Sequence, residues 1–238
     1  MHRSKGNMYE SVTHTHNEIS GTCAHACTYC YMKAILGINE RPLVFKESSN
    51  REHLGSGNVI FVGSAVDIWA EGIPSEWITK VLDHCGQYGN RYLFQSKNPA
   101  RFLEFKDHPV MKKAILVTTI ETNRWYDAMG KAPRVEERAE AMSQLAAEGF
   151  RTGVTIEPIM EFDHNELVGL VTKCKPEIVY IGKNTYKPVL LDEPKPEEVI
   201  DLALALKREG CDKVKLKKNI LPYVQPEIEK RKKLKAKR

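Results

Sequence analysis

Three cysteines stand close together near the start of the chain. Cys23, Cys27 and Cys30 form the motif C-x3-C-x2-C. With six cysteines in 238 residues, a given cysteine is followed by two others at these offsets with a probability on the order of 0.1%. The remaining cysteines lie far apart in apolar or helix-end settings: Cys85, Cys174 and Cys211. We expect those to be reduced, packed thiols, whereas the grouped thiols predict a metal site.

Two kinds of metal centre compete for the three grouped thiols. A structural zinc ion needs four ligands, usually from two close pairs, and the sequence has neither a second cysteine pair nor an H-x3-H motif. His25 could be a fourth zinc ligand, but its side chain would have to fold back between two thiolates of the same short loop. A 4Fe-4S cluster on three thiolates explains the count better, because its fourth iron stays open for a non-protein ligand. An open iron indicates an enzyme.

The rest of the chain alternates short apolar runs with helical patterns. The predicted strands are 58–64, 91–96, 114–120, 152–156, 178–182 and 213–216. The predicted helices are 74–85, 99–105, 134–148, 165–174 and 196–208. Within the segment 134–148, apolar residues recur every three to four positions, which predicts one buried face; they are Val135, Ala139, Met142 and Leu145. Residues 40–57 are rich in polar side chains and are expected to form a long loop.

Strands separated by helices of this length predict right-handed βαβ crossovers and a parallel sheet. Six such units after a first strand near residues 11–20 give an α/β fold of the open partial (β/α)6 barrel type. In parallel α/β folds the site lies at the carboxyl ends of the strands. Those ends carry a ring of polar residues: Ser64, Asp67, Gln95, Lys97, Thr119, Glu121, Glu157, Lys183 and Asn184. We expect the site to lie within this ring.

Length and composition exclude several classes of protein. A mass of 27.1 kDa suits one principal domain. Hydrophobic residues make up 42% of the chain, and no apolar run is long enough to span a bilayer, so no membrane association is expected. The first residues are polar and precede no apolar stretch, so we expect no secretory signal and a cytoplasmic location. A disulfide framework is then not expected.

The positive charge is concentrated at the end of the chain. The net charge is +5, and seven basic residues lie within 230–238, so residues 1–229 carry a net charge of −2. We expect a barrel domain over 1–222 and a basic tail over 223–238. Such a tail is typical of a solvated, frayed end, and less often of an electrostatic handle for nucleic acid.

The cysteine motif, with Tyr29 directly before its last cysteine, resembles the cluster loop of the radical SAM superfamily. Five further segments resemble, in order and spacing, a family of short radical SAM proteins common in phages and prophages and distantly similar to spore photoproduct lyase. These segments are 15–23, 61–69, 94–99, 118–123 and 154–158. The resemblance covers about 13–219. The chain departs from the family at Glu18, where proline is usual, and it lacks the Gly-Gly-Glu that many radical SAM proteins carry after the second strand.

The resemblance implies a 4Fe-4S cluster whose open iron is chelated by S-adenosylmethionine. A donor such as flavodoxin or ferredoxin would reduce the cluster, and the resulting 5′-deoxyadenosyl radical would abstract hydrogen from the substrate. The family and the basic tail favour a nucleobase, in DNA rather than RNA, and a hypermodified thymine of phage DNA undergoing isomerisation is the narrowest form of this hypothesis. The alternatives are a radical SAM enzyme acting on a free small molecule or peptide, and a non-catalytic binding module braced by zinc or a cluster.

The resemblance also implies roles for particular residues. Cys23, Cys27 and Cys30 would ligate the cluster. Residues expected to contact S-adenosylmethionine are Tyr29, Ser64, Lys97, Thr119 and Glu121. Residues from later strands are expected to face the substrate, with Glu157 and Lys183 as the catalytic candidates and Lys217 beside them.

Overall fold

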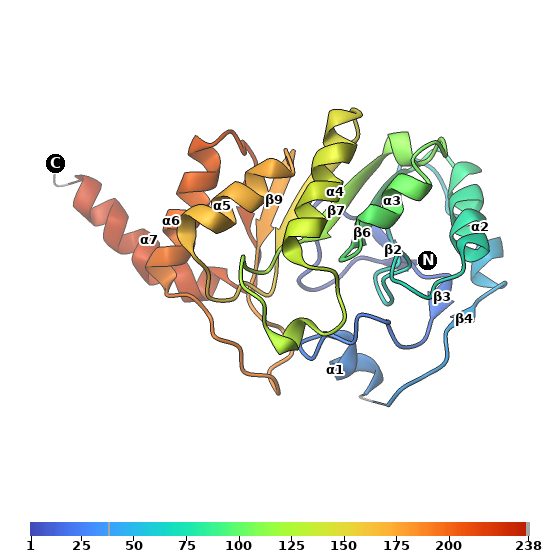
Figure 1. The fold of residues 1–238 in the computed structure, drawn as a ribbon, viewed down its shortest axis with the longest axis horizontal. Helices are drawn as coiled ribbons and strands as arrows, with labels where there is room; N and C mark the ends of the chain where they lie inside the picture. Colours follow the sequence, from blue (N-terminus) through green and yellow to red (C-terminus); the bar gives the residue numbers. More distant parts are fainter. Residues whose placement is uncertain (38, 237–238) are drawn as a thin grey trace.

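The structure is a computed structural model that describes residues 1–37 and 39–236. Its main feature is an eight-stranded sheet in the order β1-β2-β5-β6-β7-β8-β9-β10 (Figure 1). The strands are β1 His2–Arg3, β2 His14–His16, β5 Val59–Val62, β6 Arg91–Ser96, β7 Ala114–Thr119, β8 Arg151–Ile156, β9 Ile178–Ile181 and β10 Val214–Leu216. All neighbours from β2 to β10 pair in parallel, and β1 joins β2 antiparallel. A second, two-stranded sheet pairs β3 Ile19–Ser20 with β4 Val44–Phe45.

Helices α2 to α6 follow the strands along the chain and cover one face of the sheet, whereas α1 lies apart from them (Figure 1). The helices are α1 Met32–Leu36, α2 Ser75–Gly86, α3 Ala100–Glu104, α4 Val135–Ala147, α5 His164–Lys173, α6 Pro196–Arg208 and α7 Leu221–Ala236. Short 3-10 turns are η1 Ser49–Arg51, η2 Met111–Lys113 and η3 Asp127–Met129. No described helix combines the length and apolar composition needed to cross a membrane.

The predicted α/β fold is confirmed. In the described residues β10 pairs only with β9, and β1 only with β2, so the sheet stays open as in a partial barrel. The six predicted strands and five predicted helices are all present, with ends that differ by at most two residues. On α4, Val135, Ala139, Met142 and Leu145 are buried as their spacing predicts.

The concave side of the sheet is filled by the start of the chain. Because strand side chains alternate between faces, Tyr92 and Phe94 of β6 face the large core beneath the helices, whereas Leu93 belongs to a second apolar cluster. Tyr9 and Val12 pack into that second cluster. Its other buried members come from neighbouring strands: Phe61, Val117 and Tyr180. No periodic pattern in residues 1–13 predicts this N-terminal plug.

The basic end of the chain differs from the expectation of a frayed tail. Residues 221–236 form helix α7, and Val224 is fully buried. Arg231 pairs with Asp201 of α6 at 2.6 Å and with Glu227 at 2.7 Å. The boundary predicted between 222 and 223 therefore falls inside a helix, while residues 237 and 238 lie outside the described part. Residues 40–57, predicted as a long loop, contain β4 and η1.

Candidate cofactor and substrate site

A cavity of about 780 Å³ opens at the carboxyl ends of the parallel strands. It is lined by the cysteine loop (residues 21–31), by α1, by the N-terminal segment and by strand ends. Nine of the ten site residues expected from the sequence line it: Cys23, Cys27, Cys30, Tyr29, Ser64, Lys97, Thr119, Glu157 and Lys183. Lys217 lines it as well, but Glu121 does not. Segments more than 150 residues apart in the sequence thus meet at one cavity, at the strand ends where the site was expected.

The cysteine loop is held by a segment that follows β7. Thr28 donates its backbone N–H to Ala128 O at 2.9 Å, and the Cys27 thiol donates to Met129 O at 3.3 Å. Lys131 N–H donates to His25 O at 2.7 Å. Between these contacts Gly130, at φ +66°, lies so close that a Cβ there would stand 2.2 Å from His25 O. Only glycine permits this approach.

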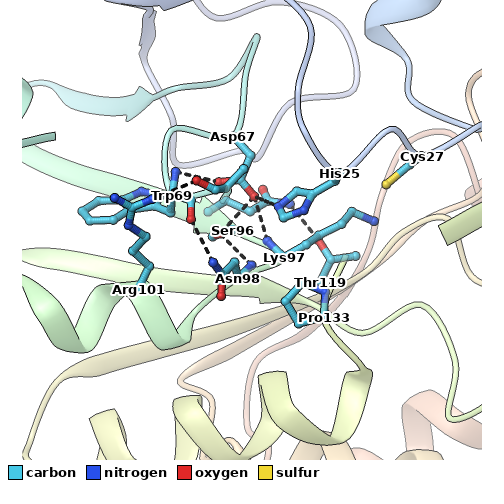
Figure 2. Close-up of polar contacts among 12 residues, drawn as sticks. His25, Cys27, Asp67, Trp69, Ser96, Lys97, Asn98, Arg101, Thr119 and Pro133 are labelled. Atoms are coloured by element: carbon cyan, nitrogen blue, oxygen red, sulfur yellow. Dashed lines mark hydrogen bonds and ion pairs between the residues drawn. The ribbon is translucent and has the colours of Figure 1, made fainter. Parts of the chain in front are cut away.

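Asp67 anchors the other side of the cysteine loop. His25 Nε2 donates to its Oδ2 at 2.8 Å, and the Ser96 hydroxyl and the Lys97 backbone N–H donate to the same oxygen at 2.9 Å (Figure 2). Burial alone would raise the pKa of Asp67, but the hydrogen bond and charge of His25 outweigh it, and the pKa is lowered. His25 is thereby committed to Asp67, which argues against its use as a fourth zinc ligand.

Glu121 lies fully buried behind the cavity wall. Its Oε1 accepts a hydrogen bond from Tyr29 at 2.6 Å and forms an ion pair with Lys97, and its Oε2 accepts from Arg138 at 2.8 Å. Burial would raise its pKa, but the positive charges of Arg138 and Lys97 prevail and lower it to about 2. Glu121 therefore holds Tyr29 and Lys97 in place from behind, and it offers no free oxygen to the cavity.

Glu157 is the centre of a second polar cluster that lines the cavity. Asn7 and Asn219 donate to its Oε1 at 2.7 and 2.9 Å, and Lys217 pairs with its Oε2 at 2.5 Å. Asn219 also donates to Lys183 O at 2.7 Å. The N-terminal segment, β8 and the segment after β10 thus meet at one carboxylate.

The remaining predicted residues occupy separate places around the cavity. Lys183 turns toward α7, with its ammonium 2.7 Å from Glu193 and 3.7 Å from the ring centre of Tyr223. The Ser64 hydroxyl accepts from Asn17 at 3.2 Å. The Thr119 hydroxyl accepts from Gln95 at 3.1 Å. The hydroxyls of Ser64 and Thr119 both line the cavity, and each has one residue as its hydrogen-bond partner.

The three grouped thiols suit a cluster better than a single ion. Among the described residues, the only three ligand-type side chains whose donor atoms all lie within 4.8 Å of one another are His16, Glu18 and His84, so the three thiols are more widely spaced. Ligands of one tetrahedral zinc ion must be closer than that, whereas in a cubane each thiolate binds a different iron. Burial raises the pKa of Cys27, and burial with the charge of Asp67 raises that of Cys23 to about 12. A bound metal would favour their thiolates.

Several residues that shape the site were not predicted from the sequence. Arg138 is fully buried in α4, where the sequence predicted only an apolar buried face. Asn7 and Asn219 lie in irregular segments that carry no periodic signal. Glu18, by contrast, stands where the resembled family usually has proline, and its hydrogen bonds to His16 and His84 satisfy this buried carboxylate.

The fold closely resembles that of solved structures of spore photoproduct lyase. A mutant of that enzyme superposes with a TM-score of 0.60 over 92% of this chain and 76% of its own, at 14% identity. A mutant with bound AdoMet and dinucleoside spore photoproduct gives 0.56 over 86% of this chain, at 14% identity, and this chain spans 63% of its length. The enzyme complexed with the dinucleoside spore photoproduct gives 0.56 over 86% of this chain and 72% of its own, at 15% identity.

The chain therefore shares the open partial-barrel fold of these structures. Spore photoproduct lyase is a radical SAM enzyme, so the predicted distant similarity is confirmed at the level of the fold. No protein-family model matches the chain, and no curated protein matches it by sequence.

Proposed function

We propose that the chain is a radical SAM enzyme that acts on a nucleobase. Cys23, Cys27 and Cys30 would hold a 4Fe-4S cluster, and S-adenosylmethionine would fill the cavity beside it. When bound, this pair supplies a 5′-deoxyadenosyl radical that abstracts hydrogen from the substrate. The observation that carries the proposal is that three thiols, with no fourth cysteine, open into one cavity at the strand ends of a radical SAM barrel.

The residues of the chain would orient the cofactor and exclude water. Tyr29 and Lys97, fixed from behind by Glu121, form the wall next to Cys27 and can face the adenosyl and carboxylate groups. Ser64 and Thr119 present hydroxyls to the cavity, which suit the ribose and amino groups because these must be paired once desolvated. Glu121 itself then acts through Tyr29 and Lys97 as a positioning residue.

The substrate would enter on the side of the second polar cluster. Glu157 and Lys183 line that wall, and Lys217 holds the Glu157 carboxylate in place through an ion pair. Neighbouring structures that hold a dinucleoside photoproduct support a nucleobase substrate. A hypermodified thymine of phage DNA, rearranged by an isomerisation, is the narrowest version, and a flavodoxin or ferredoxin in the cytoplasm would supply the electron.

Two alternative functions are also distinguished by experiment. A radical SAM enzyme acting on a free small molecule or peptide would share the same cluster and differ only in the substrate. A non-catalytic module braced by zinc is disfavoured by the spacing of the three thiols and by the commitment of His25 to Asp67.

The proposal is tested by comparing Cys27→Ala with Cys85→Ala after anaerobic purification. Cys85 is fully buried and does not line the cavity, so it is the matched thiol control. Wild type and Cys85→Ala should be brown, bleach with dithionite and cleave S-adenosylmethionine, and Cys27→Ala should do none of these, since two thiolates do not hold the cubane. A colourless wild-type protein containing zinc, or a brown and active Cys27→Ala variant, would overturn it.

A further inference from the structure

The mouth of the cavity carries more positive charge than its walls neutralise. Its lining contains two carboxylates, Asp67 and Glu157. It also contains seven cationic side chains: Arg3, Lys5, Lys33, Arg41, Lys97, Lys183 and Lys217. Both carboxylates are already engaged, Asp67 by His25 and Glu157 by Lys217. The excess therefore faces whatever enters the cavity.

The seven cations divide into two groups. The inner three each have a carboxylate partner: Lys97 with Glu121, Lys183 with Glu193, and Lys217 with Glu157. The outer four, which we call the basic rim, are Arg3, Lys5, Lys33 and Arg41. Within residues 1–37 and 39–236, none of the four forms an ion pair. Three of them are exposed and Lys33 is half-buried.

The basic rim is built on backbone that is fixed relative to the cysteine loop. Arg3 lies in β1, which pairs with β2. Arg41 donates its backbone N–H to the Thr22 hydroxyl at 2.8 Å and accepts from Thr22 N–H at 3.0 Å, directly before Cys23. Its guanidinium donates to Leu36 O at 2.6 Å. A charge held by the rim is thus positioned relative to the cluster thiols.

Apolar side chains stand beside these cations. Tyr31 is 42% exposed and Ile35 of α1 is 67% exposed, and both line the cavity with Lys33. Cationic groups that follow a phosphate backbone, interleaved with apolar and aromatic surface for bases, are the features by which proteins bind single nucleic-acid strands. A base within a duplex cannot reach such a cavity unless it leaves the stack.

We propose that the basic rim binds the phosphates of a single nucleic-acid strand, one base of which enters the cavity. This inference rests on the proposed nucleobase substrate and names the chain's own contacts to the strand. The contacts to the phosphates of the strand are assigned to Arg3 and Lys5, which precede the cysteine loop in the sequence, and to Lys33 and Arg41, which follow it.

The basic end of the chain, first considered as the handle for nucleic acid, does not take this role. Arg231 is paired with Asp201 and Glu227, and Lys230 with Glu227. No described residue of α7 lines the cavity. Figure 1 shows α7 running to the end of the molecule, away from α1. Lys232 and Lys233 on α7 are exposed and so provide a control of equal charge.

The experiment measures binding of a fluorescent single-stranded oligodeoxynucleotide of about 12 nucleotides to the full, cluster-reconstituted chain. Four phosphate contacts on a single strand correspond to a log–log salt slope of about −2.8, so wild-type affinity should fall about 50-fold between about 50 and about 200 mM salt. Lys5→Glu/Arg41→Glu should bind at least about tenfold more weakly at low salt, and its affinity should fall only about sevenfold over the same range. Lys232→Glu/Lys233→Glu should match wild type.

Three results would overturn the inference: an unchanged salt slope in the rim variant, loss of binding in the α7 variant instead, or tighter binding of a matched duplex. Arg3→Glu/Lys5→Glu repeats the test without touching the Arg41 contact to Leu36. Cleavage of S-adenosylmethionine without substrate is measured on the same samples. Cleavage without oligonucleotide binding rejects the rim inference and leaves the radical chemistry standing, whereas rim-dependent binding without cleavage supports the rim and rejects the proposed enzyme.

Discussion

Tyr29, which lies between two of the grouped cysteines, donates its phenolic hydrogen to Glu121 Oε1 at 2.6 Å, 92 residues further along the chain. Both side chains are buried, and Lys97 joins them by donating to the Tyr29 hydroxyl at 2.7 Å. The aromatic residue of the cysteine motif therefore ties the loop to the carboxyl end of β7. Tyr29, predicted to contact S-adenosylmethionine, therefore also has a supporting role in the loop itself.

Tyr29→Phe should destabilise the folded chain by about 1–3 kcal/mol, because it removes a buried donor and leaves Glu121 with one hydrogen bond fewer. Urea unfolding measures the change in the free energy of unfolding. Tyr31→Phe is the control, since Tyr31 is 42% exposed and its hydroxyl bonds to the backbone oxygen of Ser64. Equal effects of the two substitutions would contradict the role assigned to the Tyr29–Glu121 contact.

Gly130→Ala should displace the cysteine loop without removing a thiol. The new Cβ would stand 2.2 Å from His25 O and 2.9 Å from the Ala26 carbonyl carbon, which are backbone atoms that cannot move aside alone. We expect iron content per chain after reconstitution to drop by more than about half, with a further cost of about 1–2 kcal/mol for a side chain at positive φ.

Gly149→Ala separates these two effects. Gly149 also has a positive φ, of +85°, but a Cβ there meets nothing within 4 Å. The Gly149→Ala variant should lose stability because of its positive φ, but it should keep full iron content. Equal iron in both variants would show that residues 128–131 do not hold the loop.

Periodic features were the predictable part of this fold. The alternation of apolar runs with helical patterns located β5 to β10 and α2 to α6, because burial on one or both faces dictates those residues directly. The strand-end rule then placed Ser64, Thr119 and Glu157 at one cavity. Each of these inferences depends on local sequence and a general rule of topology.

Contacts between distant, irregular segments were not predictable in the same way. The plug formed by Tyr9, the Asn7–Glu157 bond and the approach of Gly130 to His25 depend on where loops return in space. The buried ion pair between Arg138 and Glu121 was not predicted, because such a pair leaves no mark in the sequence around either residue. Glu121 was expected to contact the cofactor, whereas the structure places it behind the cavity wall. Helix α7 was missed since its charged sequence has no strong apolar stripe.

Lys97→Met should make the chain more sensitive to acid. The pKa of Glu121 is about 2 in the folded chain, below its ordinary value of 4.5, so its ionised form stabilises the fold above pH 4.5 and that contribution is lost as the pH falls toward about 2. Removing the Lys97 charge raises this folded pKa, and acid unfolding should then occur at higher pH. Circular dichroism during acid titration measures the midpoint.

Lys106→Met is the matched control, because Lys106 pairs with Glu148 at the surface and should shift the acid midpoint little. Calorimetric titration of reconstituted Lys97→Met with S-adenosylmethionine checks the second role proposed for this residue. A direct contact to the cofactor carboxylate predicts at least about tenfold weaker binding. Unchanged affinity would restrict Lys97 to supporting Glu121.

His84→Gln should remove a pH dependence of stability near neutrality. His84 Nδ1 lies 2.8 Å from Glu18 Oε1 and its Nε2 lies 2.9 Å from the Glu52 carbonyl oxygen; since both partners are acceptors, both ring nitrogens donate and the ring is an imidazolium. Burial would lower its pKa, but the hydrogen bond and charge of Glu18 outweigh it and raise the pKa above 6.5.

A raised folded pKa means that charged His84 stabilises the fold fully below pH 6.5, and this contribution is lost as the pH rises through the folded value. The free energy of unfolding of wild type, measured in urea from pH 6 to 9, should therefore decline across that window. His84→Gln should flatten the decline and cost about 3 kcal/mol at its low-pH end, because it removes one of the two histidines that pair with the buried Glu18 carboxylate. His53→Gln, at an exposed histidine, should keep the wild-type slope. A slope that survives in His84→Gln would place the titrating group elsewhere.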